Sequence, residues 1–490
     1  MKHYVLALDI GTSSVRAALY DFAGNVLPAT MVKNERQLKV TDDGGAEIDA
    51  PEALAQIEQA IDDVLEKSKN LAGKIEYVAA SSFWHSLVGI DERGKPTTKV
   101  FGWADTRSRQ SVSVLRENLS ETAVHNRTGA RFHSSFWTAK LLWLQKEQKE
   151  IFNQTDKWLS FSDFAALKFF DEANTSVSMA SATGIFDVRI CDWDADLIEF
   201  LKIKRVNLPK IVEKDSQTFQ LNSKYKKRWE RLKDTEWFPA IGDGAANNIG
   251  AGCLEKSKAA LMIGTSGAMR VAFQGEIPEN IPSGLWCYRI DRKRVIFGGA
   301  LSDGGGLYRW LKDNFRLKED DDHTEEEIEK RAPDGHGLTF LPFLAGERST
   351  GYSESAHGAV LGLKSSTDTI DIVQAALESV AYRFAEIFDQ LNDVCQVREI
   401  IASGGALRES PVWTQIIADV LGQNMNLPDV REASSRGAVL LALEMIGVIK
   451  SIEEIETSKG REFKFDKRRN AIYKKARERH ERFYELLISK

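Results

Sequence analysis

The feature that most constrains this chain is a stretch near its start, residues 6–21, which reads LALDIGTSSVRAALYD. An apolar run leads into one acid, Asp9, and then into a tight, hydroxyl-rich segment at 11–14. A second apolar run follows Arg16 and ends in a turn signal at 21–25. The pattern predicts a buried strand, a tight turn and a second strand. Such a turn offers N–H groups and hydroxyls to phosphate oxygens, and an acid beside it could hold Mg²⁺.

The same pattern occurs a second time. Residues 260–273 read ALMIGTSGAMRVAF, so the Ile-Gly-Thr-Ser of residues 10–13 is repeated at 263–266. Only the first copy has the acid, because Met262 stands where that copy has Asp9. One copy alone could equally well be an ordinary hairpin with a buried acid beside its turn, without a phosphate-binding role. Two copies indicate two half-sites that clamp one polyphosphate from opposite sides.

Two aromatic and polar clusters follow the early strands. Trp84 and His85 come directly after a short apolar run, and ligands of α/β sheets bind beyond the carboxyl ends of strands. They could bind a sugar, or they could be a core tryptophan beside a histidine whose hydrogen bonds are all made within the protein.

In the second cluster Trp103, Asp105 and Arg107 alternate, so on an extended strand all three would point one way, toward a polyol. The alternative there is an Asp–Arg ion pair on a sheet edge.

A further acid, Asp243, lies between two glycines just ahead of the second copy. Glycines on both sides predict a turn that only small residues allow. Phosphoryl transfer to an alcohol needs a carboxylate that accepts the hydroxyl proton. Asp43 and Asp303 also lie beside glycines and are rivals on composition. We prefer Asp243, because it lies where the two half-sites should meet.

Taken together, these residues resemble the FGGY family of sugar kinases, within the actin-like ATPase superfamily. LDIGTSSVRA and IGTSGA are similar to its paired phosphate loops, and the family's motifs occur in order over nearly the whole chain. Within the family the similarity is greatest to gluconokinases. The stretches that carry this similarity are residues 84–86, 103–108, 126–129 and 181–184.

The resemblance implies an α/β fold of two actin-like, ribonuclease H-like domains, each a mixed sheet flanked by helices, around a central cleft. Residues 1–248 would form the N-terminal domain, with the sugar site and the first phosphate loop. Residues 249–490 would form the C-terminal, nucleotide-binding domain with the second loop. The implied reaction uses ATP and Mg²⁺ to phosphorylate a sugar or sugar-acid hydroxyl, D-gluconate to 6-phosphogluconate, by in-line transfer. The alternative is a pentulose kinase such as a xylulokinase.

The resemblance also implies roles for residues at matching positions. Asp243 is expected to be the catalytic base and to share the metal ion with Asp9. The expected substrate residues are Trp84, His85, Trp103, Asp105, Arg107, Asp243 and Gly244. The expected nucleotide residues are Gly11, Thr12, Ser13, Ser14, Arg16, Gly264, Thr265, Gly305, Arg309, Gly404, Gly405 and Glu409. A sugar acid needs a cation for its carboxylate, and Arg107, Arg131 and His133 are equal candidates.

Composition excludes several other classes. The 66 Lys and Arg residues against 72 Asp and Glu residues give a net charge of −6, so no basic field for a nucleic acid is expected. The four cysteines form no CxxC pair, which argues against a zinc site or a disulfide framework. No signal-peptide pattern and no membrane-length apolar run is present. We therefore expect a cytoplasmic enzyme without a membrane partner.

Two questions stay open at this stage. The sequence does not fix the oligomeric state, a homodimer included. An actin-like switch protein that hydrolyses ATP to change shape would also carry two phosphate loops and an acid. Such a protein would not need the Trp, His, Asp and Arg residues after the early strands, which favours the kinase.

Overall fold

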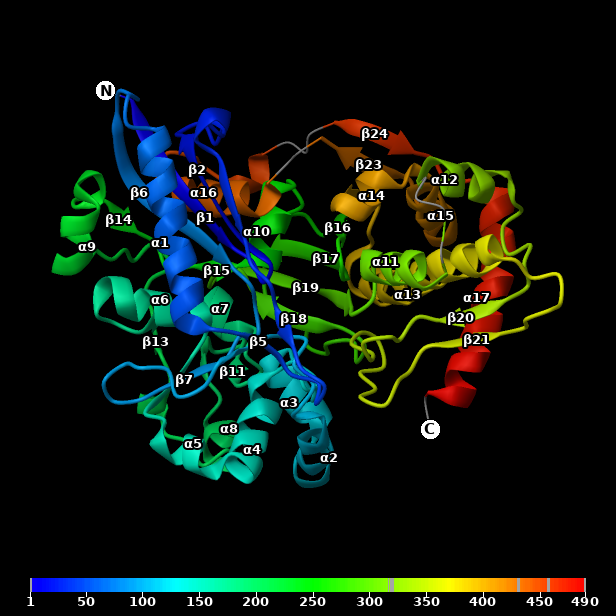
Figure 1. Ribbon diagram of the computed structural model, residues 1–490, viewed down its shortest axis with the longest axis horizontal. Coiled ribbons are helices and arrows are strands. Elements are labelled where there is room, and N and C mark those ends of the chain that lie inside the picture. Colours follow the sequence, from blue (N-terminus) through cyan, green and yellow to red (C-terminus); the bar gives the residue numbers. More distant parts are fainter. Residues whose placement is uncertain (1, 316, 318–320, 430–431, 456–458, 489–490) are drawn as a thin grey trace.

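The computed structural model describes residues 2–315, 317, 321–429, 432–455 and 459–488. Two lobes lie side by side, each built around one mixed sheet with helices on its faces (Figure 1). The predicted α/β architecture of two mixed sheets flanked by helices is confirmed.

The first sheet has the order β14-β6-β1-β2-β3, and β15 also pairs with β6. Its central strand β1 is antiparallel to β2 and parallel to β6. Every residue of β1 after the first is buried, because helices cover both faces. The bounds are β1 His3–Ile10, β2 Ser14–Asp21, β3 Val32–Glu35, β6 Lys74–Ser82, β14 Glu236–Trp237 and β15 Ile241–Gly242.

The second sheet repeats this plan in the order β18-β19-β17-β16-β22-β23-β24. Its central strand β16 is antiparallel to β17 and parallel to β22, as β1 is to β2 and β6. The strand–turn–strand prediction is therefore confirmed for both Ile-Gly-Thr-Ser copies. The bounds are β16 Lys258–Ile263, β17 Gly267–Gln274, β18 Trp286–Arg289, β19 Arg294–Leu301, β22 Glu399–Ser403, β23 Met425–Pro428 and β24 Gly460–Phe463.

Several helices begin directly after a residue whose side chain caps them. The Asp49 carboxylate accepts a 3.0 Å hydrogen bond from the Glu52 N–H at the start of α1, and Ser410 caps α15 in the same way. In the first half the bounds are α1 Ala50–Lys67, α2 Arg109–Asn118, α3 Glu121–Thr128, α4 Trp137–Glu147, α5 Lys149–Gln154, α6 Phe161–Phe170, α7 Val177–Ser181, α8 Ala195–Phe200, α9 Ser223–Arg228 and α10 Asp243–Gly250. In the second half they are α11 Gly305–Phe315, α12 Asp321–Lys330, α13 Thr369–Cys395, α14 Gly405–Glu409, α15 Pro411–Leu421, α16 Ala433–Met445 and α17 Lys467–Leu487.

Short strands outside the two main sheets shape the loops around them. Three form one small sheet, β4 Lys39–Val40, β5 Ala46–Ile48 and β8 Val100–Phe101. The others pair two by two: β7 Val88–Ile90 with β9 Lys157–Leu159, β10 Asn174–Thr175 with β13 Lys210–Ile211, β11 Phe186–Asp187 with β12 Asp192–Trp193, and β20 Thr339–Leu341 with β21 Ala359–Leu361.

Helices α10 and α16 cross between the lobes. Although α16 comes late in the sequence, it packs against β1 and β6 of the first sheet, which Figure 1 shows as an orange helix among blue strands. A Cβ atom at Gly437 of α16 would lie 1.8 Å from the Ala246 carbonyl oxygen of α10. A Cβ atom at Gly250 would lie 1.9 Å from the Ala433 carbonyl oxygen. The division at 248 and 249 remains a prediction, and a cut there would separate α16 from the sheet that it covers.

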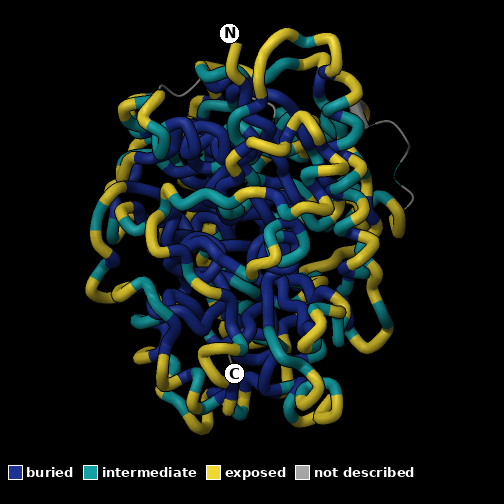
Figure 2. Tube along the Cα trace, turned by 90° about the vertical axis from the view of Figure 1, so that its left-hand side faces the viewer, coloured by how far each residue is buried: buried dark blue, intermediate teal, exposed yellow. Residues whose placement is uncertain are grey.

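The buried chain runs through the middle of the molecule, and exposed segments form its outer loops (Figure 2). The C-terminal helix α17 buries Tyr473, Ala476 and His480 and packs against α15. Among the described helices, none is both long enough and apolar enough to span a membrane.

Candidate active site

The first hairpin places its acid beside a cation. Asp9 stands opposite Arg16 in the β1–β2 register, and Arg16 Nη1 lies 3.5 Å from the Asp9 carboxylate. Ser81, in β6, donates a 2.7 Å hydrogen bond to the other Asp9 oxygen. Burial raises the pKa of Asp9, and the bonds from Ser81 and Arg16 oppose that rise. Since one carboxylate oxygen has only the long contact to Arg16 among the described side chains, it is available to a further cation.

The tip of this hairpin consists of Gly11, Thr12 and Ser13, and Ser14 is the first residue of β2. The Gly11 N–H donates to the Ser14 carbonyl oxygen at 2.9 Å, which closes the turn. Thr12 is half-buried and Ser13 is exposed. Their hydroxyl groups are therefore placed where phosphate oxygens could reach them.

Three segments meet at the second hairpin. The Gly305 N–H donates to the Gly264 carbonyl oxygen at 2.8 Å, and the next amide donates to the Thr265 carbonyl oxygen at 2.9 Å. Gly404 has φ +100°, and a Cβ atom there would lie 2.1 Å from the Ile263 carbonyl oxygen. The structure thus brings four predicted nucleotide residues together. Because the amides after Gly304 bind the hairpin, they hold it in place and do not face open space.

The other predicted nucleotide residues border this region. Gly405 begins α14, and a Cβ atom there would approach only Glu409 Oε1, at 3.9 Å, within the described part of the chain. Glu409 ends α14 and lines a neighbouring acidic surface pocket with Glu325. Arg309 is exposed on α11, one turn beyond Gly305. Open space above Gly405 is consistent with a ligand there.

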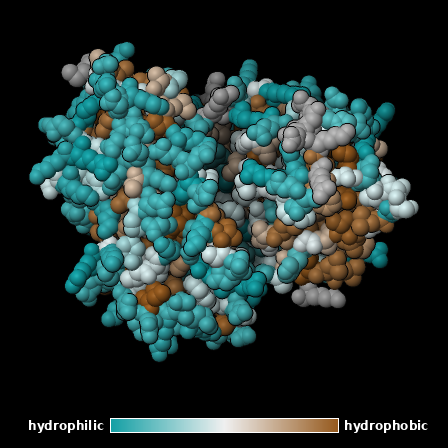
Figure 3. Space-filling view, viewed as in Figure 1, coloured by the Kyte–Doolittle hydropathy of each residue, from teal (hydrophilic) through white to brown (hydrophobic). Residues whose placement is uncertain are grey.

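Asp243 is the first residue of α10, so the turn predicted around it is instead the first turn of a helix. Its carboxylate accepts a 2.8 Å hydrogen bond from the Gly244 N–H. The pKa of Asp243 is raised to about 6, because desolvation and, to a lesser extent, the charge of Asp9 raise it more than Arg270 lowers it. Asp243 lines a pocket, and Ser266 of the second hairpin lines the same pocket. The two hairpins therefore both approach this acid. Figure 3 shows a hollow between the two lobes.

Trp84 explains the glycines beside Asp243. A Cβ atom at Gly242 would lie 1.8 Å from Trp84 Nε1, and one at Gly244 would lie 2.4 Å from Trp84 Cζ3. The indole Nε1 donates a 3.1 Å hydrogen bond to the Ser178 carbonyl oxygen. Trp84 lines the pocket and is only 6% exposed, so it is packed into the core and also borders the pocket.

His85 lines the same pocket and stays neutral. Its backbone is left-handed, with φ +66°. Nδ1 lies 2.7 Å from the Ala182 carbonyl oxygen, and burial lowers the pKa of the ring well below its ordinary value. With the proton on Nδ1, Nε2 is left as a hydrogen-bond acceptor.

The second cluster differs from its prediction, because β8 ends at Phe101 and residues 103–107 lie in a loop with turns at 103–104 and 107–108. The extended-strand prediction is wrong, since the partner strand β5 offers β8 only two pairs. The Asp105 carboxylate pairs with Arg107 at 2.5 Å, and Arg107 also pairs with Glu47 at 3.1 Å. Of the cluster, Trp103 alone lines the pocket of Asp243 in the described structure.

The pocket residues that the sequence-based prediction missed include three large side chains from the second lobe: Arg270, Trp286 and Arg348. Arg348 Nη2 lies 3.5 Å from His85 Nε2. Within the described residues, neither arginine forms an ion pair with a carboxylate. A signal for Arg270 was present, because a single arginine interrupts the apolar run of the second Ile-Gly-Thr-Ser copy.

The cations first considered for a substrate carboxylate are already engaged. Arg107 pairs with two acids, as described above. Arg131 Nε lies 2.8 Å from Glu121. His133 Nε2 lies 3.6 Å from Glu354, and burial lowers the His133 pKa to about 4, so the ring is neutral at pH 7.

The two rival acids have local structural roles. The Asp43 carboxylate accepts a 2.5 Å hydrogen bond from the Thr41 hydroxyl on an exposed turn. The Asp303 carboxylate accepts a 3.1 Å hydrogen bond from the Ala345 N–H. Neither lines the pocket of Asp243 in the described structure.

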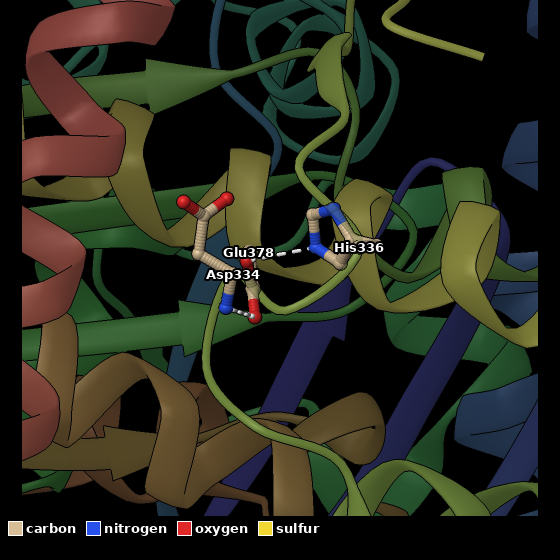
Figure 4. Close-up of side chains that lie close together, drawn as sticks. All are labelled: Asp334, His336 and Glu378. Carbon is tan, nitrogen blue, oxygen red and sulfur yellow. Dashed lines mark hydrogen bonds and ion pairs between the residues drawn. The ribbon is translucent and has the colours of Figure 1, made fainter. Parts of the chain in front are cut away.

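Another group of candidate metal ligands, besides Asp9 and Asp243, consists of Asp334, His336 and Glu378. These three residues form a hydrogen-bond network (Figure 4). His336 Nδ1 accepts a 2.9 Å hydrogen bond from the Leu338 N–H, so the ring proton is on Nε2, 3.2 Å from Glu378. Arg479 pairs with both Asp334 oxygens. Both nitrogens of the His336 ring are thus engaged within the protein, and the network joins the loop after α12 to α13 and α17.

Comparison with known proteins identifies the family. Residues 4–250 match the N-terminal domain of the FGGY family of carbohydrate kinases, and residues 259–445 match its C-terminal domain. The chain belongs to the FGGY family of carbohydrate kinases. It is therefore a sugar kinase, and the alternative of an ATP-driven switch protein is wrong.

Relatives with different substrates are similar to this FGGY chain. The gluconokinase of Bacillus subtilis is 29% identical over 93% of this chain and 90% of its own. The xylulose kinase of Staphylococcus xylosus is 26% identical over 90% of each. The gluconate kinase structure from Lactobacillus acidophilus superimposes with a TM-score of 0.90 at 25% identity, covering 99% of this chain and 98% of its own. The fold is thus that of the family, and the comparisons leave the sugar open.

Proposed function

We propose that this FGGY kinase transfers the γ-phosphoryl group of ATP to a hydroxyl of a sugar acid, D-gluconate, to give 6-phosphogluconate. The observation that carries the proposal is the charge of the pocket between the lobes. Among the described residues that line it are one carboxylate, Asp243, and two guanidinium groups, Arg270 and Arg348, while His85 is neutral. A net positive pocket around a catalytic acid suits an anionic polyol. The similarity to gluconokinases supports the same substrate.

In the proposed reaction Asp243 accepts the proton of the attacking hydroxyl and orients its oxygen. That oxygen forms a bond to the γ-phosphorus, the bond from the γ-phosphorus to the bridging oxygen breaks, and ADP leaves. The hydroxyls and amides around Thr12 and Thr265 would hold the phosphate oxygens from two sides. The adenosine would lie over Gly404 and Gly405, at the start of α14.

Mg²⁺ fits the donor set beside the phosphates. Asp9 and Asp243 are desolvated carboxylates, and Asp9 raises the pKa of Asp243, so a cation between them would relieve their repulsion. We propose that these two acids hold the ion, which neutralises phosphate charge when bound. The residues of the pocket bind the substrate, and Asp243 positions the hydroxyl and removes its proton.

We further propose that the enzyme works in the cytoplasm. All four cysteines are unpaired and three of them are buried, which suits a reducing compartment. A fractionation that recovers the protein from an oxidising compartment would contradict this.

A coupled assay of ADP release tests the function. D-Gluconate, D-xylulose, D-ribulose and glycerol are supplied singly, and a reaction without sugar gives the background. We expect the highest kcat/KM with gluconate. A higher value with xylulose would establish the pentulose kinase instead.

A further inference from the structure

The Arg270 side chain is a buried cation without a carboxylate partner among the described residues. It is 7% exposed, and its Nε and Nη1 atoms have no hydrogen-bond partner in that part of the chain. Burial lowers the pKa of this guanidinium to about 10, and the attraction of Asp243 opposes the change. A buried charge without a partner is costly, so an anion at this place would be bound firmly.

The second sheet leaves a slot for this side chain. Arg270 on β17 stands opposite Gly298 on β19, and Gly298 stands opposite Trp286 on β18. Residues opposite one another share a face of the sheet, so no side chain separates Arg270 from Trp286. A Cβ atom at Gly298 would lie 2.1 Å from the Met269 carbonyl oxygen, which explains the glycine. Figure 1 shows these three strands as neighbours in the central part of the molecule.

The direction of β17 places Arg270 at the sugar end of the pocket. The strand runs away from Ser266, in the tip of the second hairpin, and Ala268 and Arg270 lie on one of its faces. All three residues line the pocket of Asp243. Arg270 is therefore two residues farther from the phosphate hairpin than Ala268 along this face.

The guanidinium itself lies beside the sugar-binding candidates. A Cβ atom at Gly244 would lie 3.1 Å from Arg270 Nε and 2.4 Å from the Trp84 ring. A substrate with its reacting hydroxyl at Asp243 and its phosphoryl donor at Ser266 would direct its other end toward Trp84 and Arg270.

We propose that Arg270 binds the carboxylate of the sugar acid and thereby sets the preference for acids over neutral polyols of the same length. This inference rests on the proposed function of gluconate phosphorylation. A guanidinium group suits the role, because it can donate two parallel hydrogen bonds to one carboxylate.

The test compares D-gluconate with D-gluconamide, in which a neutral amide replaces the carboxylate on the same carbon skeleton. For the wild-type enzyme we expect kcat/KM to favour gluconate by on the order of 100-fold, as for a buried charge pair. In Arg270→Met that preference should fall to about 1, because the KM for gluconate should rise far more than the KM for gluconamide. Arg270→Lys keeps the positive charge but cannot donate two parallel hydrogen bonds to one carboxylate, so its preference for gluconate over gluconamide should be intermediate.

The matched control is Arg205→Met, which removes an exposed ion pair with Asp192 and should keep the wild-type preference. Equal loss of activity on both acceptors in Arg270→Met would overturn the inference and assign Arg270 to phosphoryl transfer. If Arg270→Met does not fold, Arg270→Lys gives the test. The inference would be overturned if this variant kept the wild-type preference for gluconate over gluconamide and if calorimetry without ATP showed an unchanged affinity for gluconate. The wild-type arm alone tests the proposed function, which fails if gluconate is a poorer substrate than xylulose.

Discussion

His85 Nε2 lies 3.5 Å from Arg348 Nη2, so a residue of the first lobe meets a residue of the second inside the pocket. Burial, and then the charge of Arg348, lower the pKa of His85 well below its ordinary value. The ring is therefore neutral at physiological pH, and its Nε2 atom is a hydrogen-bond acceptor.

Removal of this acceptor should affect sugar binding selectively. Asparagine tolerates the left-handed backbone at position 85. We expect His85→Asn to raise the KM for the sugar by about 10-fold, the value of one lost hydrogen bond, and to leave the KM for ATP unchanged. Initial rates with each substrate varied in turn give both constants. A rise confined to the KM for ATP would contradict the placement of His85.

Asp243→Asn should lower kcat by about 10³-fold with little change in sugar affinity, because the base acts mainly in the transition state. Single-turnover rates with gluconate measure the effect. The matched control is Asp303→Asn, whose carboxylate binds the Ala345 N–H outside the pocket. Near-normal kcat in Asp243→Asn, with a large loss in the control, would reassign the base to Asp303.

The pH dependence of kcat/KM should report Asp243. The base must be deprotonated, and its pKa is about 6, so activity should fall as the pH drops through that value. Because Arg270 lowers the Asp243 pKa, Arg270→Met should move this acid limb to higher pH. A profile of kcat/KM for gluconamide from pH 5 to 8 tests both statements. A limb that stays in place in the variant would show that the two groups are not coupled.

Gly404 and Gly405 are adjacent glycines for which we expect opposite phenotypes. At Gly404, φ is +100° and a Cβ atom would lie 2.1 Å from the Ile263 carbonyl oxygen, so Gly404→Ala should cost about 2 kcal/mol or more of unfolding free energy. At Gly405 the space is open. Gly405→Val should fold normally and raise the KM for ATP more than the KM for the sugar. Denaturant unfolding and initial rates separate the two effects, and a raised sugar KM alone in Gly405→Val would place the nucleotide elsewhere.

The crossing of α10 and α16 should depend on its glycines. Gly437→Ala would force a Cβ atom to 1.8 Å from the Ala246 carbonyl oxygen and push the helices apart. We expect a loss of about 2 kcal/mol or more in unfolding free energy, together with lower kcat, because Asp243 begins α10. Denaturant unfolding and initial rates measure the two losses.

The control for that crossing is Gly447→Ala, just beyond the end of α16. The φ angle there is +75°, and an added Cβ atom would meet nothing within 4 Å among the described residues. This variant should therefore lose only the roughly 1 kcal/mol of a left-handed backbone and keep its kcat. Unchanged stability in Gly437→Ala would show that the helices can separate freely.

Local patterns determined much of the fold and the first part of the site. Apolar runs around the Ile-Gly-Thr-Ser segments predicted both hairpins, because strand burial depends on residues close in sequence. The same locality placed Trp84 and His85 at the end of a strand and Asp243 beside the second hairpin. The turn at Asp243 was mistaken because a pair of glycines also fits a helix start that packs on an indole, and that indole is more than 150 residues away in the chain.

Only the tertiary structure decided which charges face the pocket. Arg107 and Asp105 alternate as a strand edge would, but β5 ends beside them and they pair with each other. Arg270 and Arg348 come from the second sheet and a distant loop, and they enter the pocket because the lobes meet at Trp84 and His85. A charged side chain pairs with the group that folding brings near it. That partner depends on contacts across the whole fold, and the spacing of residues in the sequence does not reveal it.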